Sequence, residues 1–371
     1  MFFFVFMLTT KKLFVISRLP YFRKGSPVID YVSCRLPLDW DLPINGGRVV
    51  HLKADGSIDF SAEKTLWLPG SYSAKMSIIS DGIGFVRLSG NPSKFLQGHN
   101  LFGVDDIIGL VFETMTRICS MLQLVPTGEN LSVWRSGDYP MSRVDLTFMY
   151  ELETFDDVNA WLLSASKSAS IKYRGRGHYQ EGTLYYGKVA KGKRASNWQF
   201  KLYHKGAEIL VPHHRLPADL PRCDDLVFWA RNKLRIELTL RTGELKRLGL
   251  LRAADLDPVQ VPSVFSRYLA KIEIGEDQMI EVEVEQELKP RHRAVIALWR
   301  TGVDIRTVLK RSQFYNVRRE IFEAVSIDIG SICQDGANVV RLRRVLEARP
   351  AQLPEWASEV MHRPSGLRLV A

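Results

Sequence analysis

The chain has 371 residues, a length that allows two domains and a sizeable hydrophobic core. Its 51 lysines and arginines outnumber its 41 aspartates and glutamates, and the resulting net charge of +10 favours a polyanionic partner. The four cysteines lack the paired spacing of a zinc site. We therefore expect reduced cysteines in a cytoplasmic protein, with no disulfide framework and no zinc site.

The N-terminus carries an apolar run, Met1–Leu8, which is followed by Lys11 and Lys12. This run is too short to span a bilayer, which needs about 20 residues, and a signal peptide has its positive charge before its apolar segment. We expect residues 1–27 to be an extension that is disordered or arises from a wrong start site, with Val28 as the true initiator. A short amphipathic membrane anchor is the alternative, although we expect no membrane partner.

The segment from residue 28 to residue 257 alternates predicted strands with predicted helices. A good helix is predicted at 104–122, because Asp105 and Asp106 occupy its first turn and apolar residues recur at helical spacing. These elements predict an α+β fold with a mostly antiparallel central sheet flanked by helices. The other expected elements are strands at 29–36, 47–52, 83–89 and 142–151, a helix at 156–166 and a hairpin of 171–180 with 183–187. The basic turn Lys188–Arg194 is either a solvated loop or a phosphate contact, and its position directly before the segment 197–208 favours the contact.

Three alternating segments each place polar residues on one face and apolar residues on the other. They are Ser142–Phe148, Asn197–Glu208 and Lys233–Arg241. If all three belong to one sheet, the apolar faces build a core and the polar faces meet. The polar residues are then Arg143, Asp145 and Thr147 on the first segment, Lys201, Tyr203 and Lys205 on the second, and Arg235, Glu237 and Thr239 on the third.

This polar face suits a tyrosine that attacks a phosphodiester. A phenol becomes nucleophilic when nearby cations lower its pKa, and Tyr203 stands between two lysines. Asp145 and Glu237 supply the hard oxygen ligands that magnesium or manganese prefers. Rival nucleophiles are Tyr185 and Tyr186. The pattern alone also fits a surface tyrosine on ordinary amphipathic strands that carry cross-strand salt pairs.

Several motifs together resemble one protein family, the gene II and gene X replication initiators of filamentous bacteriophages. The resemblance covers roughly Val28 to the end of the third strand, and the rest more loosely. The motifs are I-D-Y-V-S-C-R-L-P-L (Ile29–Leu38), S-G-N-P-S-K-F-L-Q-G-H-N-L-F-G (Ser89–Gly103), S-R-V-D (Ser142–Asp145), K-L-Y-H-K-G-A-E (Lys201–Glu208) and R-I-E-L (Arg235–Leu238).

The resemblance implies a rolling-circle initiator with a fold like that of rolling-circle nucleases. Such a protein nicks one strand at the phage origin, leaves a 3′-hydroxyl for the host polymerase, and later cuts and rejoins the displaced single strand. Tyr203 matches the nicking tyrosine, and Lys205 matches the lysine two residues later. The implied partners are double- and single-stranded origin DNA and the host helicase and polymerase.

The metal ligands depart from the pattern of related nucleases, which carry a His-hydrophobic-His triplet that is absent here. His213 and His214 are adjacent and would point to opposite faces of a strand. Asp145 is the expected ligand to a divalent metal, Mg²⁺ or Mn²⁺, and its expected companions are Glu208 and Glu237. His99 is either a further ligand or a residue that shapes the Gln97–Asn100 loop. Expected DNA contacts are Lys201, Arg143 and Arg235.

A hinge at Pro258–Pro262 leads to a second region, residues 263–371, which is predicted to be helical, basic and DNA-binding. Helices are expected at 294–300, 304–309 and 312–324, the last with Ser312 as its N-cap. Gln313, Asn316, Arg318 and Arg319 then face a DNA groove, and Phe314, Val317, Ile321 and Phe322 pack inward. This pattern fits a helix-turn-helix reader and equally any basic three-helix bundle.

The sequence therefore predicts a site-specific, metal-dependent DNA endonuclease and strand transferase in the bacterial cytoplasm. ATP dependence is not expected, because the glycine pair Gly175 and Gly177 lacks the lysine and hydroxyl of a phosphate-binding loop. Two alternatives stay open. One is a non-catalytic control protein that binds the origin or single strands, and the other is a tyrosine strand transferase of plasmid mobilisation or transposition.

Overall fold

The computed structural model describes residues 14–15, 26–40, 43–72, 74–171, 175–180, 182–187, 197–274, 288–300, 303–325, 328–330 and 348–364. The predicted basic turn Lys188–Arg194 and most of the predicted extension 1–27 lie outside these ranges. Within the described part of the chain, no helix is long and apolar enough to cross a bilayer.

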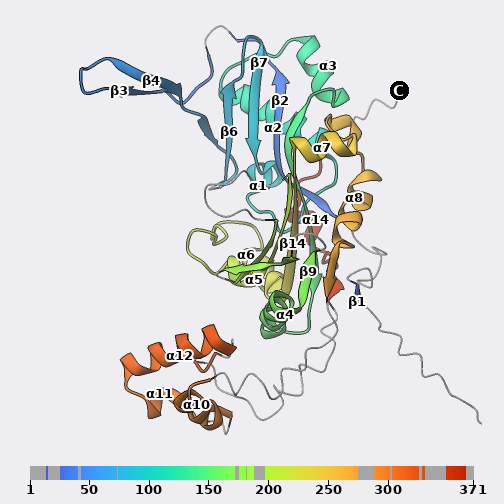
Figure 1. Ribbon diagram of the computed structural model, residues 1–371. Coiled ribbons are helices and arrows are strands. Elements are labelled where there is room, and N and C mark those ends of the chain that lie inside the picture. The colour runs from blue at the N-terminus through green and yellow to red at the C-terminus, as the bar shows by residue number, and fades with distance from the viewer. Residues whose placement is uncertain are drawn as a thin grey trace, which may run out of the picture.

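A ten-stranded antiparallel sheet forms the centre of the molecule, so the predicted α+β class with a mostly antiparallel central sheet is confirmed (Figure 1). A short strand, β16 (Arg349–Pro350), pairs with the end of β8 beyond Val28, the first residue of β2. The remaining order across the sheet is β11 (His178–Gln180), β12 (Thr183–Tyr186), β13 (Trp198–His204), β14 (Lys233–Arg241), β8 (Met141–Glu151), β2 (Val28–Pro37), β7 (Phe85–Gly90), β6 (Lys75–Ser80) and β5 (Leu66–Pro69).

Two predicted strand regions lie outside the central sheet. The region 47–52 forms β3 (Arg48–Leu52), which pairs with β4 (Ile58–Glu63) in an exposed hairpin that projects from the body of the molecule (Figure 1). The first part of the predicted hairpin 171–180 instead joins a small second sheet. That sheet contains β1 (Phe14–Val15), β15 (Ile272–Ile274), β9 (Ala169–Ile171) and β10 (Gly175–Arg176).

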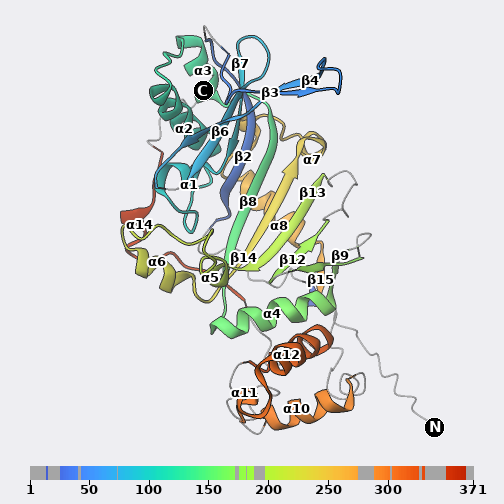
Figure 2. The same cartoon turned by 90° about the vertical axis from the view of Figure 1, so that its left-hand side faces the viewer.

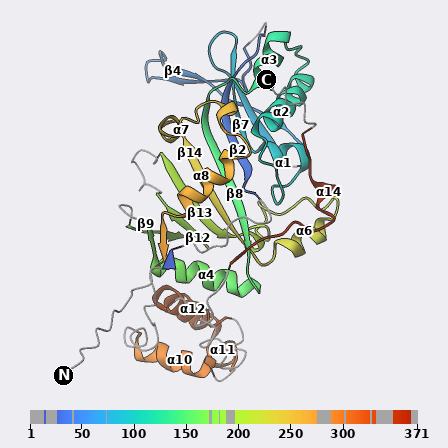
Figure 3. The same cartoon turned by 90° about the vertical axis from the view of Figure 1, so that its right-hand side faces the viewer.

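The main hydrophobic core lies on one face of the central sheet. Alternate residues of β14, from Leu234 to Leu240, are fully buried there against helices, as the strand pattern predicted. Figure 3 shows α7 and α8 crossing this face. The helices that contribute to the core include α2 (Ile107–Met121), α3 (Gly128–Ser136), α4 (Phe155–Ser168), α7 (Thr242–Leu248) and α8 (Gln260–Leu269).

The opposite, polar face of the sheet is covered by smaller elements. These are the loop after α1 (Pro92–Gln97), α5 (Lys205–Glu208), α6 (Cys223–Ala230) and the C-terminal segment. A second, separate apolar cluster forms here, where Leu101 and Phe102 of the loop pack with Met149 of β8. Figure 2 shows α5 and α6 beside the lower ends of β8 and β14, and these elements cover that part of the polar face, where Tyr203 and Glu237 are buried.

Three helices after residue 288 form a unit with its own core, at the lower end of the molecule in Figure 1. All three were predicted: α10 (Pro290–Arg300), α11 (Ile305–Val308) and α12 (Arg311–Val325). The expected N-cap is wrong, because α12 begins at Arg311, before Ser312. Phe322 was expected to pack inward, but it is 43% exposed, whereas Phe314 and Ile321 are buried as predicted.

Residues 348–364, here called the C-terminal strap, return to the central sheet although they follow the three-helix unit in sequence. Trp229 Nε1 donates to the carbonyl of Gln352 at 3.1 Å, and Arg222 pairs with Glu359 at 2.7 Å. The strap includes α14 (Ala357–Val360) and joins the second apolar cluster. The predicted second region thus includes two segments, α8 and the strap, that pack on the first region.

We predict that Trp356→Ala loosens the strap. The Trp356 ring packs on Phe102 with ring centres 5.7 Å apart, and the Arg222 guanidinium lies over it. Because the indole is half-buried, the free energy of unfolding should fall by about 2 kcal/mol. Trp67, which is 59% exposed on β5, provides the control, and Trp67→Ala should change the value by no more than about 0.5 kcal/mol. Equal losses in urea denaturation would contradict a structural role for the strap.

Candidate active site

Three adjacent strands bring the predicted polar residues onto one face. In the register of β13, β14 and β8, Lys201 lies opposite Glu237, which lies opposite Thr147. Tyr203 lies opposite Arg235 in the neighbouring row. The predicted position of Lys205 on this strand was wrong, because β13 ends at His204 and Lys205 is the first residue of α5.

Tyr203 is a buried hydrogen-bond donor. Its hydroxyl donates to Glu237 Oε1 at 2.7 Å, and the residue is only 9% exposed. Burial raises the pKa of Tyr203 well above its usual 10; Arg235 opposes this shift and the Glu237 carboxylate adds to it. The expected lowering of this pKa by the flanking lysines is therefore not seen in this arrangement, and the alternative role of Lys205, holding the phosphate, stays a prediction.

Both lysines are engaged with carboxylates. Lys201 Nζ lies 3.5 Å from Glu237 Oε2, and Lys205 forms a buried ion pair with Glu208. The Lys205 ammonium also lies 5.9 Å from the centre of the Tyr203 ring. Burial lowers the pKa of Lys205, an effect that Glu208 opposes. Lys205 thus lies close to Tyr203, as predicted, but its charge is paired with the Glu208 carboxylate.

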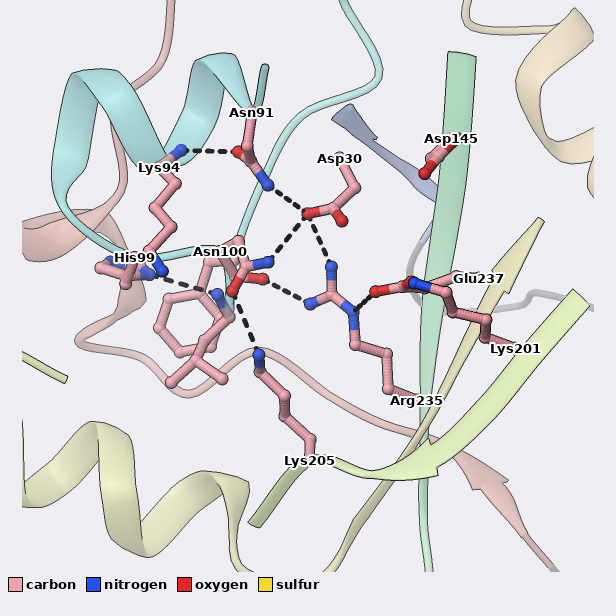
Figure 4. A network of polar contacts seen from close by, with 12 residues as sticks. Asp30, Asn91, Lys94, His99, Asn100, Asp145, Lys201, Lys205, Arg235 and Glu237 are labelled. Carbon is pink, nitrogen blue, oxygen red and sulfur yellow. Dashed lines mark hydrogen bonds and ion pairs between the residues drawn. The ribbon is translucent and has the colours of Figure 1, made fainter. Parts of the chain in front are cut away.

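Arg235 is the centre of the polar network and is completely buried (Figure 4). Its Nη2 lies 2.7 Å from Asp30 Oδ1, its Nε donates to Glu237 Oε1 at 3.2 Å, and its Nη1 donates to the Asn100 carbonyl at 2.5 Å. Burial alone lowers the pKa of a guanidinium, but Asp30, Tyr203 and Glu237 outweigh it and raise the pKa of Arg235. The charge is therefore retained inside the protein.

Asp30 belongs to this network, although no pattern in the sequence selected it. Its Oδ1 accepts hydrogen bonds from Asn91 at 2.6 Å and Asn100 at 3.0 Å, in addition to pairing with Arg235. Burial raises the pKa of Asp30, but Arg235 and Lys205 outweigh burial, so the net shift is downward. Asp30 stays ionised as the counter-charge of Arg235.

A β-bulge explains why alternation missed Asp30. Strict alternation along β2 places Asp30 on the same side as Val32, which is in the core. The register with β8 shifts between Ile29 and Tyr31, so Ile29 faces the core and Asp30 faces the polar side. Bulges re-aim side chains in this way.

His99 holds the loop that covers the polar face. Its Nε2 lies 3.0 Å from the Val360 carbonyl, which can only accept, so this nitrogen carries the hydrogen. Its Nδ1 then accepts from the Leu101 backbone N–H at 3.3 Å. Both ring nitrogens are engaged, which matches the loop-shaping alternative; the metal-ligand role stays a prediction.

The predicted metal ligands do not surround a common point. In the described part of the chain, no group of three or more histidine, cysteine or acidic residues is arranged to hold a metal. Asp145 accepts two hydrogen bonds from Arg143, at 2.8 and 2.5 Å, while Glu208 and Glu237 pair with Lys205 and Arg235. Every one of these carboxylates already has a cationic partner, so the arrangement does not fit a metal ion.

The predicted DNA-contacting residues are divided between two sites. Arg143, Lys201 and Arg235 lie on the polar face and pair with carboxylates. Arg318 lies in the three-helix unit and forms a two-pronged pair with Asp328, at 2.6 and 2.7 Å. Arg319, on the same helix, is exposed.

The rival tyrosines differ in position. Tyr186 is 2% exposed and packs in the main core, on the face away from Tyr203. Tyr185 pairs with Lys201 and so shares the polar face, one strand farther from Glu237. Tyr203 is thus the tyrosine among the three whose hydroxyl contacts Glu237.

Comparison with known proteins identifies the family. A family model described as the N-terminal part of a phage replication-associated protein, the gene II protein, matches residues 28–262, and the model of its C-terminal part matches residues 284–362. The chain belongs to this family. It is 33% identical over 337 residues to the replication-associated gene II protein of Enterobacteria phage I2-2, covering 88% of this chain and 95% of that relative. The family predicted from the motifs is confirmed.

We predict that His99 makes the fold acid-sensitive. Burial lowers the pKa of His99 from 6.5 to about 4, so between pH 6.5 and 4 the unfolded chain takes up a proton that the folded chain does not. Stability is unaffected above this window and falls within it, by up to about 3 kcal/mol for this group. His204, whose pKa burial also lowers to about 4, adds a loss of the same sign.

The measurement is urea denaturation of the wild type and His99→Asn at pH 7 and pH 4.5. Asn is expected to lower stability at pH 7 but to reduce the additional loss at pH 4.5. His213→Asn, at an exposed position, should leave the difference between the two pH values unchanged. A pH dependence that is identical in the wild type and His99→Asn would rule out His99 as its source.

Proposed function

We propose that this protein initiates phage DNA replication by nicking one strand of the phage origin, with Tyr203 as the nucleophile. The supporting observation is the hydrogen bond from the Tyr203 hydroxyl to Glu237, at 2.7 Å, with Glu237 itself held by Arg235. A nucleophile bonded to a base that a third group orients is the general arrangement of activated nucleophiles. Membership of the family of phage replication-associated proteins supports the same assignment.

The proposed reaction exchanges one phosphate ester for another. The Tyr203 oxygen attacks the phosphorus while Glu237 takes the phenolic proton, and a bond forms between oxygen and phosphorus. The bond from phosphorus to the 3′-oxygen breaks, and this oxygen takes a proton from water to become a 3′-hydroxyl. The protein is then attached to the 5′-phosphate end created at the nick, and the free 3′-hydroxyl serves the host polymerase.

Glu237 is in our proposal the general base, in place of the metal-ligand role expected from sequence. The high pKa of Tyr203 makes such a base necessary, because almost no phenolate exists at neutral pH. Arg235 and Lys201 both lie beside Glu237 and keep its side chain in position.

Access of DNA to this tyrosine requires some of the elements that cover the polar face to move, since Tyr203 is only 9% exposed. A strand phosphate that arrives near Lys201 or Lys205 competes with the carboxylates now paired to these lysines. Freed carboxylates provide oxygen ligands, so a requirement for Mg²⁺ or Mn²⁺ stays part of our proposal without an assigned step.

The three-helix unit is proposed to bind the duplex origin through Arg318 and Arg319. Arg319 is exposed on α12, whereas Arg318 must exchange Asp328 for a phosphate. Such contacts set affinity and leave the cleavage chemistry to the sheet. In this proposal the protein works in the bacterial cytoplasm with the host helicase and polymerase.

We predict that Tyr203→Phe abolishes both nicking and covalent attachment. The change removes the phenolic oxygen and one hydrogen bond, so the free energy of unfolding should fall by only about 1 kcal/mol. The assay incubates supercoiled origin DNA with the protein and Mg²⁺ and detects nicked circles with protein on the 5′ end. Tyr185→Phe, on the same face, is the control and should retain both activities. An adduct formed by Tyr203→Phe would move the nucleophile to another residue.

We also predict that Glu237→Gln slows nicking by about 10²- to 10⁴-fold, because an amide accepts the phenolic hydrogen bond but not the proton. Origin binding should change little. Glu151→Gln, at the end of β8 where Glu151 pairs with Lys233, is the matched control and should nick normally. If Mn²⁺ restores the activity of Glu237→Gln, Glu237 is a metal ligand and our assignment of the base is wrong.

A further inference from the structure

A cavity of about 400 Å³ lies beneath the C-terminal strap, beside the polar network. Its walls include Phe102, Trp229, Met149 and Met361, and the rings of Phe102 and Trp229 meet edge to face with centres 4.9 Å apart. Ligand pockets in proteins have volumes of about 300–1,000 Å³ and mostly apolar, aromatic walls. The size and lining of this cavity therefore suit a small planar ligand.

One polar group in the wall of this cavity lacks a partner. Thr147 lines the cavity and is 1% exposed, and its hydroxyl makes no hydrogen bond. A buried hydroxyl without a partner costs about 1–3 kcal/mol, so such groups are uncommon in folded proteins. The unpaired Thr147 hydroxyl is therefore an independent sign that a ligand with a polar edge completes the site.

The cavity adjoins the nucleophile. In the sheet register Thr147 pairs directly with Glu237, the residue that accepts the hydrogen bond from Tyr203, so one strand spacing of about 4.8 Å separates their backbones. Arg235 also lines the cavity while donating to Glu237. The cavity wall thus adjoins Glu237 through Thr147 and Arg235, although Glu237 and Tyr203 do not themselves line the cavity.

The charges around the cavity select which part of a nucleotide can enter. Asp105 and Asp106 line it and repel phosphate, and the Arg235 charge is already paired with Asp30 and Glu237. Arg363, which also lines it, is exposed and can meet a phosphate outside. A neutral nucleobase satisfies both conditions, because its ring is flat and apolar on its faces and its edge offers hydrogen-bonding groups. The sugar and phosphate then stay at the opening.

We propose that this cavity binds one unstacked nucleobase of the cut strand, next to the scissile phosphate, with the Thr147 hydroxyl bonded to the base edge. The proposal rests on the nicking function assigned above and adds to it a determinant of site choice. Stacking of a base on aromatic side chains contributes about 1–3 kcal/mol, which offsets the cost of unstacking it from the strand.

The test measures binding of single-stranded origin DNA to full-length Tyr203→Phe protein, so that the strand stays uncut. Abasic sites replace the bases one at a time around the nick. At one position, loss of the base should weaken binding about 10- to 100-fold, as expected from the stacking energy. Ala351→Phe, which fills the cavity from the strap, should remove the sensitivity at that position and at no other.

A matched pair of variants keeps the test independent of misfolding. Thr147→Val and Thr114→Val each remove a buried hydroxyl that has no partner, but Thr114 lies in α2 and does not line the cavity. Thr147→Val should weaken binding of the intact strand about 3- to 10-fold and leave binding of the abasic strand unchanged. Thr114→Val should change neither.

Three results would overturn the cavity assignment. The first is that no position has a base sensitivity that disappears in Ala351→Phe and falls in Thr147→Val. The second is an equal effect of Thr147→Val and Thr114→Val, and the third is a wild type that does not bind the strand at all. Failure of the nicking function is seen separately, as the absence of a covalent adduct in protein with Tyr203 intact.

Discussion

The buried guanidinium of Arg235 is the interaction on which the polar face depends. It joins three separate parts of the chain, since it contacts Asp30 on β2, Glu237 on its own strand and the Asn100 carbonyl in the covering loop. An unpaired charge in this position would cost several kcal/mol, and breaking a buried pair typically costs about 3–5 kcal/mol. The positions of these groups therefore depend on one another. Because Arg235 is held in place, the Glu237 carboxylate that accepts the hydrogen bond from Tyr203 is held in place too.

Alternation along the strands explains which residues of this polar face could be predicted from the sequence. The strands β8, β13 and β14 were predicted because each has an apolar face that must be buried, and burial on one face fixes what the other face presents. Asp145, Tyr203 and Glu237 follow from this alternation alone. Asp30 does not, because a bulge is a defect in the alternation on which the prediction depends.

Lys205 shows a second limit of pattern reading. The alternation of Asn197–Glu208 continued past the end of the strand, but the His204 side chain accepts from the Ala207 backbone N–H and starts a short helix instead. Local hydrogen bonding of this kind ends a strand without changing its hydrophobic pattern. Lys205 nevertheless reaches the tyrosine, by a different route from the one that the pattern indicated.

The contact between the loop that contains His99 and the C-terminal strap could not be predicted from the sequence, for a different reason. His99 and Val360 are bonded although 261 positions separate them, and a whole helical unit lies between them in the chain. No local pattern reports such a contact. The strap nevertheless lines the cavity beside Thr147 and Arg235. The segment that was hardest to place from sequence therefore shapes the surroundings of the proposed nucleophile.

In the reaction that we propose, Tyr203 must both attack the strand and later be released from it, and its raised pKa fits that requirement. A neutral, covered phenol attacks nothing until a strand is in place and Glu237 can take its proton, so the resting protein stays unreactive. In the proposed ester, the phenol is a better leaving group than the sugar, because a phenol is ordinarily a stronger acid than an aliphatic hydroxyl. Attack by a 3′-hydroxyl therefore releases the tyrosine readily, and the protonated Glu237 is placed to return the proton to it.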